Sequence, residues 1–153
     1  MASKSKWQQL CNDAWFARKR CDFQTAKILL LSAVEEVKND PADLVDLCVT
    51  LNTLANLYAE NGDLPKAVAI ARSIVELHRQ STGTERGFLG GHLMFLAMVL
   101  MEAGEFEEAV QFAEEGERFY AQVMGETHSE TQRMRKVLTD ARNQLAGIAT
   151  TLE

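Results

Sequence analysis

Apolar side chains recur along this chain every three or four residues, which is the spacing of one face of an α-helix. The clearest stretch carries Leu47, Leu51, Leu54 and Tyr58 at that spacing. With two prolines and few clusters of Val or Thr, the chain offers little material for strands. The pattern therefore predicts an all-α fold. Seven helices are expected, at residues 5–19, 22–38, 42–61, 64–81, 86–103, 106–123 and 128–146.

Helix termini are marked most clearly between the third and fourth predicted helices. Gly62 accepts the left-handed conformation that a helix C-terminus favours. Asp63 can cap the next helix, whose first turn tolerates Pro65. Ala67 and Ala71 lie on its apolar face, where small side chains let paired helices approach closely. These features predict a tightly packed helix pair.

The chain repeats itself with a period of 42 residues. Leu51-Asn52-Thr53-Leu54-Ala55 matches Leu93-Met94-Phe95-Leu96-Ala97, and Gly62 matches Gly104 in the same register. Several small and large residues that recur in one register indicate stacked structural repeats. The predicted repeats span residues 5–40, 42–82 and 86–125.

The two ends of the array depart from this pattern. In the first repeat, Cys21 stands where the other two copies have the turn glycine. After the third repeat, Thr127-His128-Ser129-Glu130 fits a capping box that opens a final helix. That helix is more polar than those before it, as an array requires where stacking stops. We therefore expect one domain at residues 1–147, with 148–153 as a tail.

Two consecutive glycines, Gly90 and Gly91, fall early in the fifth predicted helix. Each glycine costs about 1 kcal/mol relative to alanine in a helix interior. Either this helix begins later than residue 86, or a backbone or a ligand approaches closely at this point. The later start is the simpler interpretation.

Composition narrows the class of protein. The chain has 153 residues, 46% of them hydrophobic, and a net charge of −6. Such an acidic protein repels a phosphate backbone on average, so general nucleic-acid binding is not expected. No apolar run approaches the roughly 20 residues that span a bilayer, and the N-terminus does not resemble a signal peptide. With three widely spaced cysteines, these features favour a cytoplasmic protein without membrane insertion.

Residues for catalysis or cofactor binding do not form a recognisable pattern. His78, His92 and His128 lack metal-ligand spacing, and we interpret them as two helix-surface histidines and one loop or cap histidine. The glutamates between residues 105 and 117 are explained by a solvated helix face. No phosphate loop, nucleophile elbow or dinucleotide fingerprint occurs. We expect no enzyme activity, no cofactor and no metal.

The second repeat resembles a tetratricopeptide repeat. From Leu51 to Ala67 it reads Leu-x-x-Leu-Ala-x-x-Tyr-x-x-x-Gly-x-x-x-x-Ala. The 42-residue period and the loops at 83–86 and 125–128 are similar to those of the kinesin-light-chain type. The resemblance implies a right-handed superhelix of helix pairs, three pairs plus a C-terminal capping helix. It also implies that the first helices of the pairs line a concave surface that binds a protein or peptide.

Candidate binding residues follow from this resemblance. The family's asparagine that holds the backbone of an extended peptide corresponds to Asn52, and Asn56 lies one turn further on. An amide can read a peptide backbone because it both donates and accepts hydrogen bonds. The alternative is that both side chains are simply solvated. The family's clamp for C-terminal carboxylates is mostly missing here, so binding of chaperone tails is disfavoured.

The equivalent positions of the other repeats complete the predicted site. In the third repeat they form a row of methionines, which suits an adaptable apolar groove or, equally, core packing. In the first repeat they include an aromatic residue beside basic residues, which suits a binding hot spot or, equally, burial of the aromatic ring beneath the N-terminus. The full set of predicted peptide-binding residues is Trp15, Arg18, Asn52, Asn56, Met94, Met98, Met101 and Arg133.

The sequence predicts an adaptor that binds a segment of another protein, and two alternatives stay open. The Met and Phe surface of the third repeat could instead mediate self-association, which would make the protein a homo-oligomeric assembly subunit. The repeats could also form a regulatory domain that changes shape when it binds a small signalling peptide.

Overall fold

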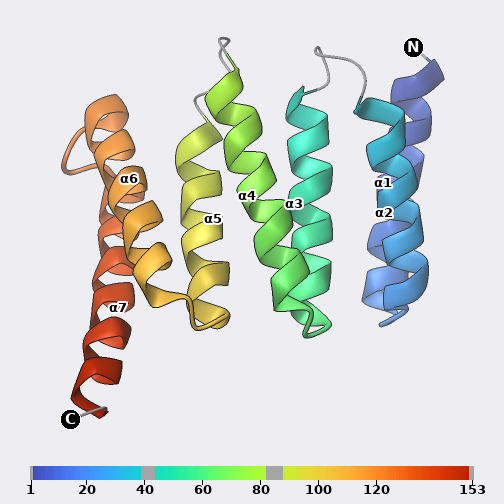
Figure 1. The fold of residues 1–153 in the computed structure, drawn as a ribbon. Helices are drawn as coiled ribbons and strands as arrows, with labels where there is room; N and C mark the ends of the chain where they lie inside the picture. The colour runs from blue at the N-terminus through green and yellow to red at the C-terminus, as the bar shows by residue number, and fades with distance from the viewer. Residues whose placement is uncertain (1, 39–43, 82–87, 152–153) are drawn as a thin grey trace. The chain divides into compact units, whose positions relative to one another are not determined.

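The computed structural model describes residues 2–38, 44–81 and 88–151, and these form helices joined by turns, without strands. Seven helices lie in the described ranges, as the sequence predicts (Figure 1). Their bounds are α1 Ala2–Lys19, α2 Phe23–Val37, α3 Leu44–Glu60, α4 Leu64–Gln80, α5 Leu89–Glu102, α6 Phe106–Met124 and α7 Ser129–Thr151. The loop motif predicted at 83–86 lies outside the described residues.

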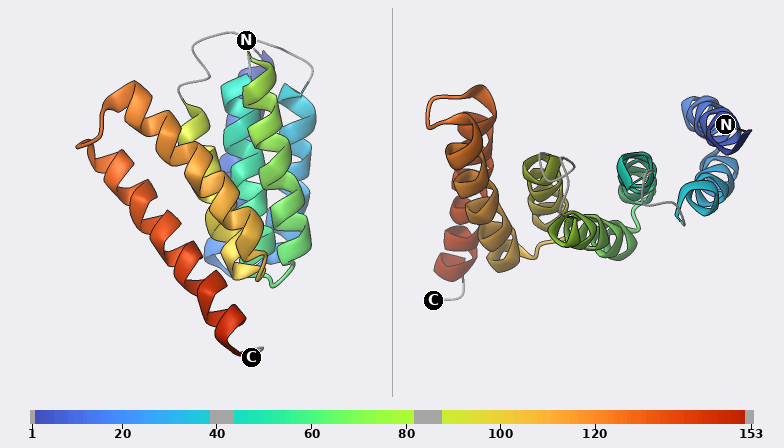
Figure 2. Two further views of the ribbon diagram at one scale, coloured as in Figure 1. Left: turned by 60° about the vertical axis from the view of Figure 1, so that its left-hand side comes forward. Right: turned by 90° about the horizontal axis from the view of Figure 1, so that it is seen from above.

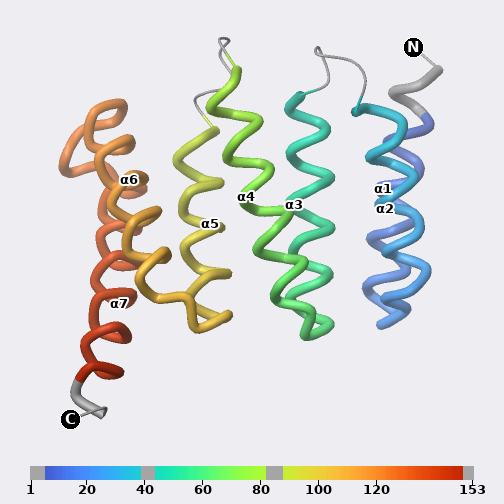
Figure 3. The backbone as a smooth tube through the Cα atoms, viewed as in Figure 1, coloured from blue at the N-terminus to red at the C-terminus, as the bar shows by residue number. Residues whose placement is uncertain are grey.

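The helices form two compact units, Met1–Ile74 and Val75–Glu153, with the boundary inside α4. In the first unit, α1 and α2 form a hairpin and α3 packs on α2 (Figure 3). Small residues make this hairpin close, because Ala14, Ala17 and Ala26 are all at most 2% exposed. Leu54 and Leu57 of α3 complete the same core cluster.

Three turns of the chain share one hydrogen-bonded form. After α3, the amide of Gly62 donates to the carbonyl of Ala59 and the amide of Asp63 donates to that of Tyr58. This is a Schellman motif, which places its central residue in the left-handed region. Gly62 and Gly104 have φ of 81° and 79° there, and Cys21 has φ of 58°. Cys21 therefore occupies the glycine position of the first repeat, as predicted.

Replacing Cys21 with glycine is expected to stabilise the protein. A side chain in the left-handed conformation costs roughly 1–2 kcal/mol, part of which is offset because glycine gains entropy in the unfolded chain. We expect Cys21→Gly to raise the free energy of unfolding by about 0.5–1 kcal/mol in urea titrations. Gly62→Cys should have the opposite effect, and equal stabilities for all three proteins would contradict the argument.

The second unit is built around α5, which is apolar on almost every side. Leu93, Leu96 and Leu100 are fully buried. Helices α6 and α7 lie side by side in both views of Figure 2 and pack closely on each other. The buried face of α7 consists of Thr131, Met134, Leu138 and Ala141, and most of its remaining surface is exposed and polar.

Of the two explanations for the paired glycines, the later helix start holds. Helix α5 begins at Leu89, so Gly90 and Gly91 lie in its first turn rather than in its interior. In addition, α6 approaches closely, because a Cβ built on Gly90 would lie 2.6 Å from Cζ of Tyr120. The absence of a Cβ at Gly90 is thus a requirement of the packing of α6 against α5.

The C-terminal helix differs from its prediction at both ends. It continues to Thr151 instead of ending near residue 146. At its start, His128 replaces the predicted Thr127 cap, since the amide of Glu130 donates to Nδ1 of His128 over 3.2 Å. The amide of Gln132 donates to the carbonyl of His128 over 3.0 Å. The predicted capping box was wrong because the imidazole nitrogen of His128 accepts the hydrogen bond from the Glu130 amide that the box assigned to the hydroxyl of Thr127.

Candidate functional site

The two predicted asparagines of α3 are partly buried rather than freely solvated. The Nδ2 atom of Asn56 donates to the backbone carbonyl of Asn52 over 2.9 Å. The Oδ1 atom of Asn52 is enclosed and accepts no hydrogen bond from the described residues. An enclosed acceptor without a donor is unfavourable by an amount comparable to a lost hydrogen bond. The side chain would therefore gain from any rotation that gave Oδ1 a donor.

Trp15 and Arg18 lie together on α1, where both line a hollow of about 380 Å³. Trp15 is 52% exposed, and Nζ of Lys19 lies 5.3 Å from the centre of its indole ring. Arg18 donates from Nε to Glu60 of α3 over 2.8 Å. The two predicted residues thus form one aromatic and charged surface, which also includes the exposed thiol of Cys21.

The methionine row of α5 divides between core and surface. Met94 is 7% exposed and belongs to the core, whereas Met98 is 48% exposed and Met101 is partly buried. Because α5 is apolar on nearly all sides, helical spacing alone does not separate these roles. Met98 is therefore the member of the row that offers the largest surface to a partner.

Arg133, the last predicted residue, stands on the exposed face of α7. Its side chain is 66% exposed and pairs with Glu130 one turn earlier, over 3.0 Å. Such a local pair between exposed side chains is weak. Arg133 therefore remains available to an outside carboxylate.

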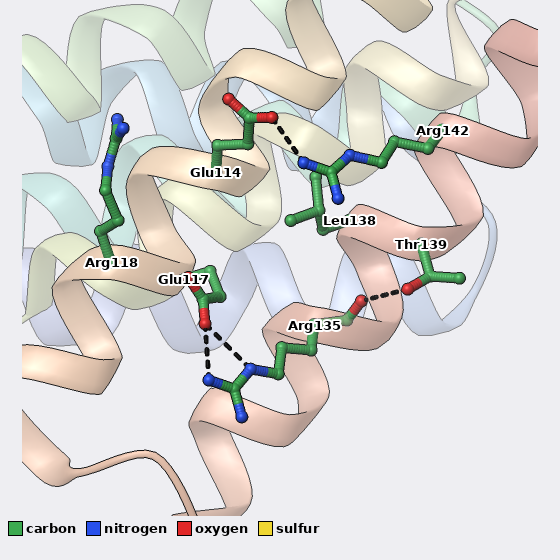
Figure 4. A pocket seen from close by; sticks show the side chains of 7 residues that line it. All are labelled: Glu114, Glu117, Arg118, Arg135, Leu138, Thr139 and Arg142. Atoms are coloured by element: carbon green, nitrogen blue, oxygen red, sulfur yellow. Dashed lines mark hydrogen bonds and ion pairs between the residues drawn. The ribbon is translucent and has the colours of Figure 1, made fainter.

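A hollow of about 420 Å³ lies between α6 and α7 and is lined by ion pairs (Figure 4). Arg142 pairs with Glu114 over 2.7 Å, and Arg135 pairs with Glu117 over 2.8 Å. In Figure 4, the side chain of Arg118 points away from both pairs. The two paired arginines, Arg135 and Arg142, come from α7, whose ion-pair partners the sequence analysis did not assign.

The glutamates of α6 are therefore not simply a solvated face, as the sequence analysis proposed. Glu114 and Glu117 hold arginines of α7, and Glu115 pairs with Arg79 of α4 over 2.5 Å. These pairs join residues 18 to 36 positions apart. No local pattern in the sequence predicts them, because they depend on how the helices are packed.

The interpretation of the histidines as separate surface residues was wrong for two of the three. His78 of α4 is fully buried, and its ring stacks on that of His92 of α5 with 4.8 Å between ring centres. Burial, with a smaller contribution from the charge of His78, lowers the pKa of His92 to about 4. In the described ranges, no cluster of three or more His, Cys, Asp or Glu residues could hold a metal ion.

Two of the three cysteine thiols are poor nucleophiles. Burial raises the pKa of Cys48 to about 11, and burial also raises the pKa of Cys11. A thiolate is the reactive form of cysteine, so both side chains act as small apolar groups at neutral pH. All three cysteines are free thiols.

Residues 46–122, half of the chain, match the family model for the tetratricopeptide repeat. The chain belongs to the tetratricopeptide repeat family. Repeats of this family generally mediate protein–protein interactions. The matched range includes α3 with Asn52 and Asn56 and α5 with Met98. Within the described ranges, no helix is both long and apolar enough to cross a membrane.

Solved structures support the same fold. Nearly identical repeats from Podosopora anserina, described as those of a kinesin light chain, align with a TM-score of 0.78 at 19% identity. That alignment covers 92% of this chain and 67% of the other. BtubC (BKLC) from P. vanneervenii aligns with a TM-score of 0.71 at 17% identity, over 95% of this chain and 63% of the other. No curated protein matched the chain.

Proposed function

We propose that this tetratricopeptide repeat protein is a non-catalytic adaptor that binds a segment of a partner protein. The supporting observation is Asn52, whose amide oxygen is enclosed without a hydrogen-bond donor from the described residues and lies within the range that matches the family model. Residues 1–147 would act as one binding module. A cytoplasmic location, expected from the free cysteines, is part of the same proposal.

The asparagine side chains suit recognition of a peptide backbone. If the Asn52 side chain rotates toward a bound segment, its oxygen can accept a backbone N–H and its nitrogen can donate to a carbonyl. The hydrogen bond from Asn56 to the carbonyl of Asn52 joins the two residues locally, and its loss would not disturb other helices. Binding would thus satisfy an acceptor that is unsatisfied in the free protein.

Affinity would come from the exposed apolar side chains among the predicted residues. Trp15 and Met98, each about half exposed, offer the largest apolar surfaces among the predicted residues. Aromatic side chains often dominate binding energy, and a flexible methionine adapts to varied partners. Arg18 and Arg133 would each add charge-assisted hydrogen bonds to a partner.

The test is the double variant Asn52→Ala, Asn56→Ala. Alanine favours helix more than asparagine does, so we expect the variant to fold with an unchanged or slightly higher melting temperature. Loss of hydrogen bonds to a bound backbone should weaken affinity for a captured partner by about tenfold, measured by calorimetry. Thr53→Ala, one position along the same helix, is the matched control. Wild-type affinity in the double variant would exclude the asparagines from binding.

A further inference from the structure

The stacked histidines of the second unit have no part in the proposed binding function. His78 lies in the last turn of α4 and His92 in the first turn of α5. Their ring planes are 19° apart with centres separated by 4.8 Å, which is an aromatic stack of two imidazoles. His78 is completely buried, whereas His92 is only partly so. Solvent protons can therefore reach His92 first.

We infer that this stack is an acid-sensitive contact between two helices. Protonation of His92 weakens the packing of the first turn of α5 against the last turn of α4. Three features of the geometry disfavour protonation of the His92 ring. The ring is partly withdrawn from water, which disfavours its charged form. It lies in the first turn of α5, where the helix dipole is positive and repels a cation. It also faces a second imidazole that can itself become positive.

The charged groups on the surrounding helices do not compensate for that proton. On α5, Glu102 is the other ionisable side chain and lies at the opposite end of the helix. Arg79 of α4 pairs with Glu115 of α6. Glu76, also on α4, lies 3.9 Å from the same arginine. Near α5's first turn, α6 provides Tyr120, a neutral phenol whose pKa burial raises further.

On α7, the two charged groups that act on Tyr120 are Glu130 and Arg133, and they pair with each other. Among all the charged groups of the described residues, His78 is the one that acts on His92. Within the part of the chain that the structure describes, no carboxylate is therefore placed to stabilise an imidazolium at this position.

The direction of the pH effect follows from the two states of His92. Its pKa is about 4 in the folded protein, against 6.5 for the unperturbed side chain. Between these values the unfolded chain binds a proton that the folded protein does not, so stability falls as the pH decreases. The stability that the protein owes to neutral His92 is fully present above pH 6.5 and is lost progressively as the pH decreases to 4. Solvent screening reduces its size, because His92 is partly exposed.

The experiment compares thermal unfolding of the full chain and its His92→Gln variant between pH 7.5 and pH 5. Glutamine does not titrate, so the difference between the two profiles isolates the histidine from the carboxylates. We expect the wild-type melting temperature to fall about 4 °C more than that of the variant.

Parallel profiles for wild type and His92→Gln would overturn the inference. If glutamine disturbs the packing at neutral pH, His92→Phe keeps a planar ring in the stack and provides the same comparison. NMR of the wild type gives an independent result, because the His92 ring resonances of the folded protein should not titrate between pH 7.5 and pH 5. A His92 titration centred near pH 6.5 would also overturn the inference.

Discussion

Gly90→Ala is expected to destabilise the protein by about 2 kcal/mol, whereas Gly91→Ala, one position later, is expected to be neutral or slightly stabilising. A Cβ on Gly90 would lie 2.6 Å from Cζ of Tyr120 and 2.9 Å from Cδ1 of Phe119. Tyr120 is 5% exposed, so its ring cannot move aside without displacing neighbours. A Cβ on Gly91 would meet only the hydroxyl of Tyr120, at 3.7 Å, which is an ordinary contact.

Urea titrations of the two variants measure this difference directly. Both substitutions replace glycine with alanine in the same helical turn, so their intrinsic effects on helix formation are similar. The difference in their free energies of unfolding therefore reports the close approach of α6 to α5. Equal stabilities for the two variants would mean that Tyr120 does not pack against Gly90 as described.

Met134→Ala is expected to cost about 3 kcal/mol, because it removes a fully buried side chain that fixes α7 to the rest of the second unit. The methionine lies over Gly116 of α6, where an added Cβ would overlap its terminal methyl. Gly116→Ala alone should therefore also be destabilising, by about 1–2 kcal/mol. In the Met134→Ala background, the new methyl enters the space that the methionine left, so the two costs should not add.

A double-mutant cycle measured by chemical denaturation checks this coupling. Arg142→Gln is the control for electrostatic attachment of α7, since the pair between Arg142 and Glu114 is largely exposed. Such pairs contribute about 0–1 kcal/mol, so this variant should be much more stable than Met134→Ala. If Arg142→Gln were the more damaging change, ion pairs rather than apolar packing would hold the terminal helix.

The sequence predicts the repeated elements well because they depend on local features. Helical spacing located all seven helices, and the recurring turn position identified Cys21 as the equivalent of Gly62. The Schellman turn needs only a few consecutive residues, so it can be recognised without knowledge of packing. The glycine pair at 90–91 predicted a late helix start, which is present, whereas the group that lies against Gly90 is the side chain of Tyr120 rather than a backbone or a ligand.

The site and the histidine stack depend on contacts between helices, which spacing does not specify. Met94 and Met98 share a helical row, yet one is buried and the other half exposed, because neighbouring helices cover α5 unevenly. His78 and His92 are separated by a loop and meet only through packing. The enclosed oxygen of Asn52 likewise requires the folded structure, and no pattern of residue types indicates it.

The central claim is that a partner binds to the exposed side chains of α1, α3 and α5. Photo-crosslinking in a lysate of the source cells tests it most directly, with p-benzoylphenylalanine placed at Trp15 or Met98. The same group at Ser73 of α4 or Gln111 of α6, both exposed, provides matched controls. The account predicts that one partner protein is crosslinked from Trp15 and Met98 and not from the controls. Crosslinking of that partner from Ser73 and Gln111 alone would contradict it.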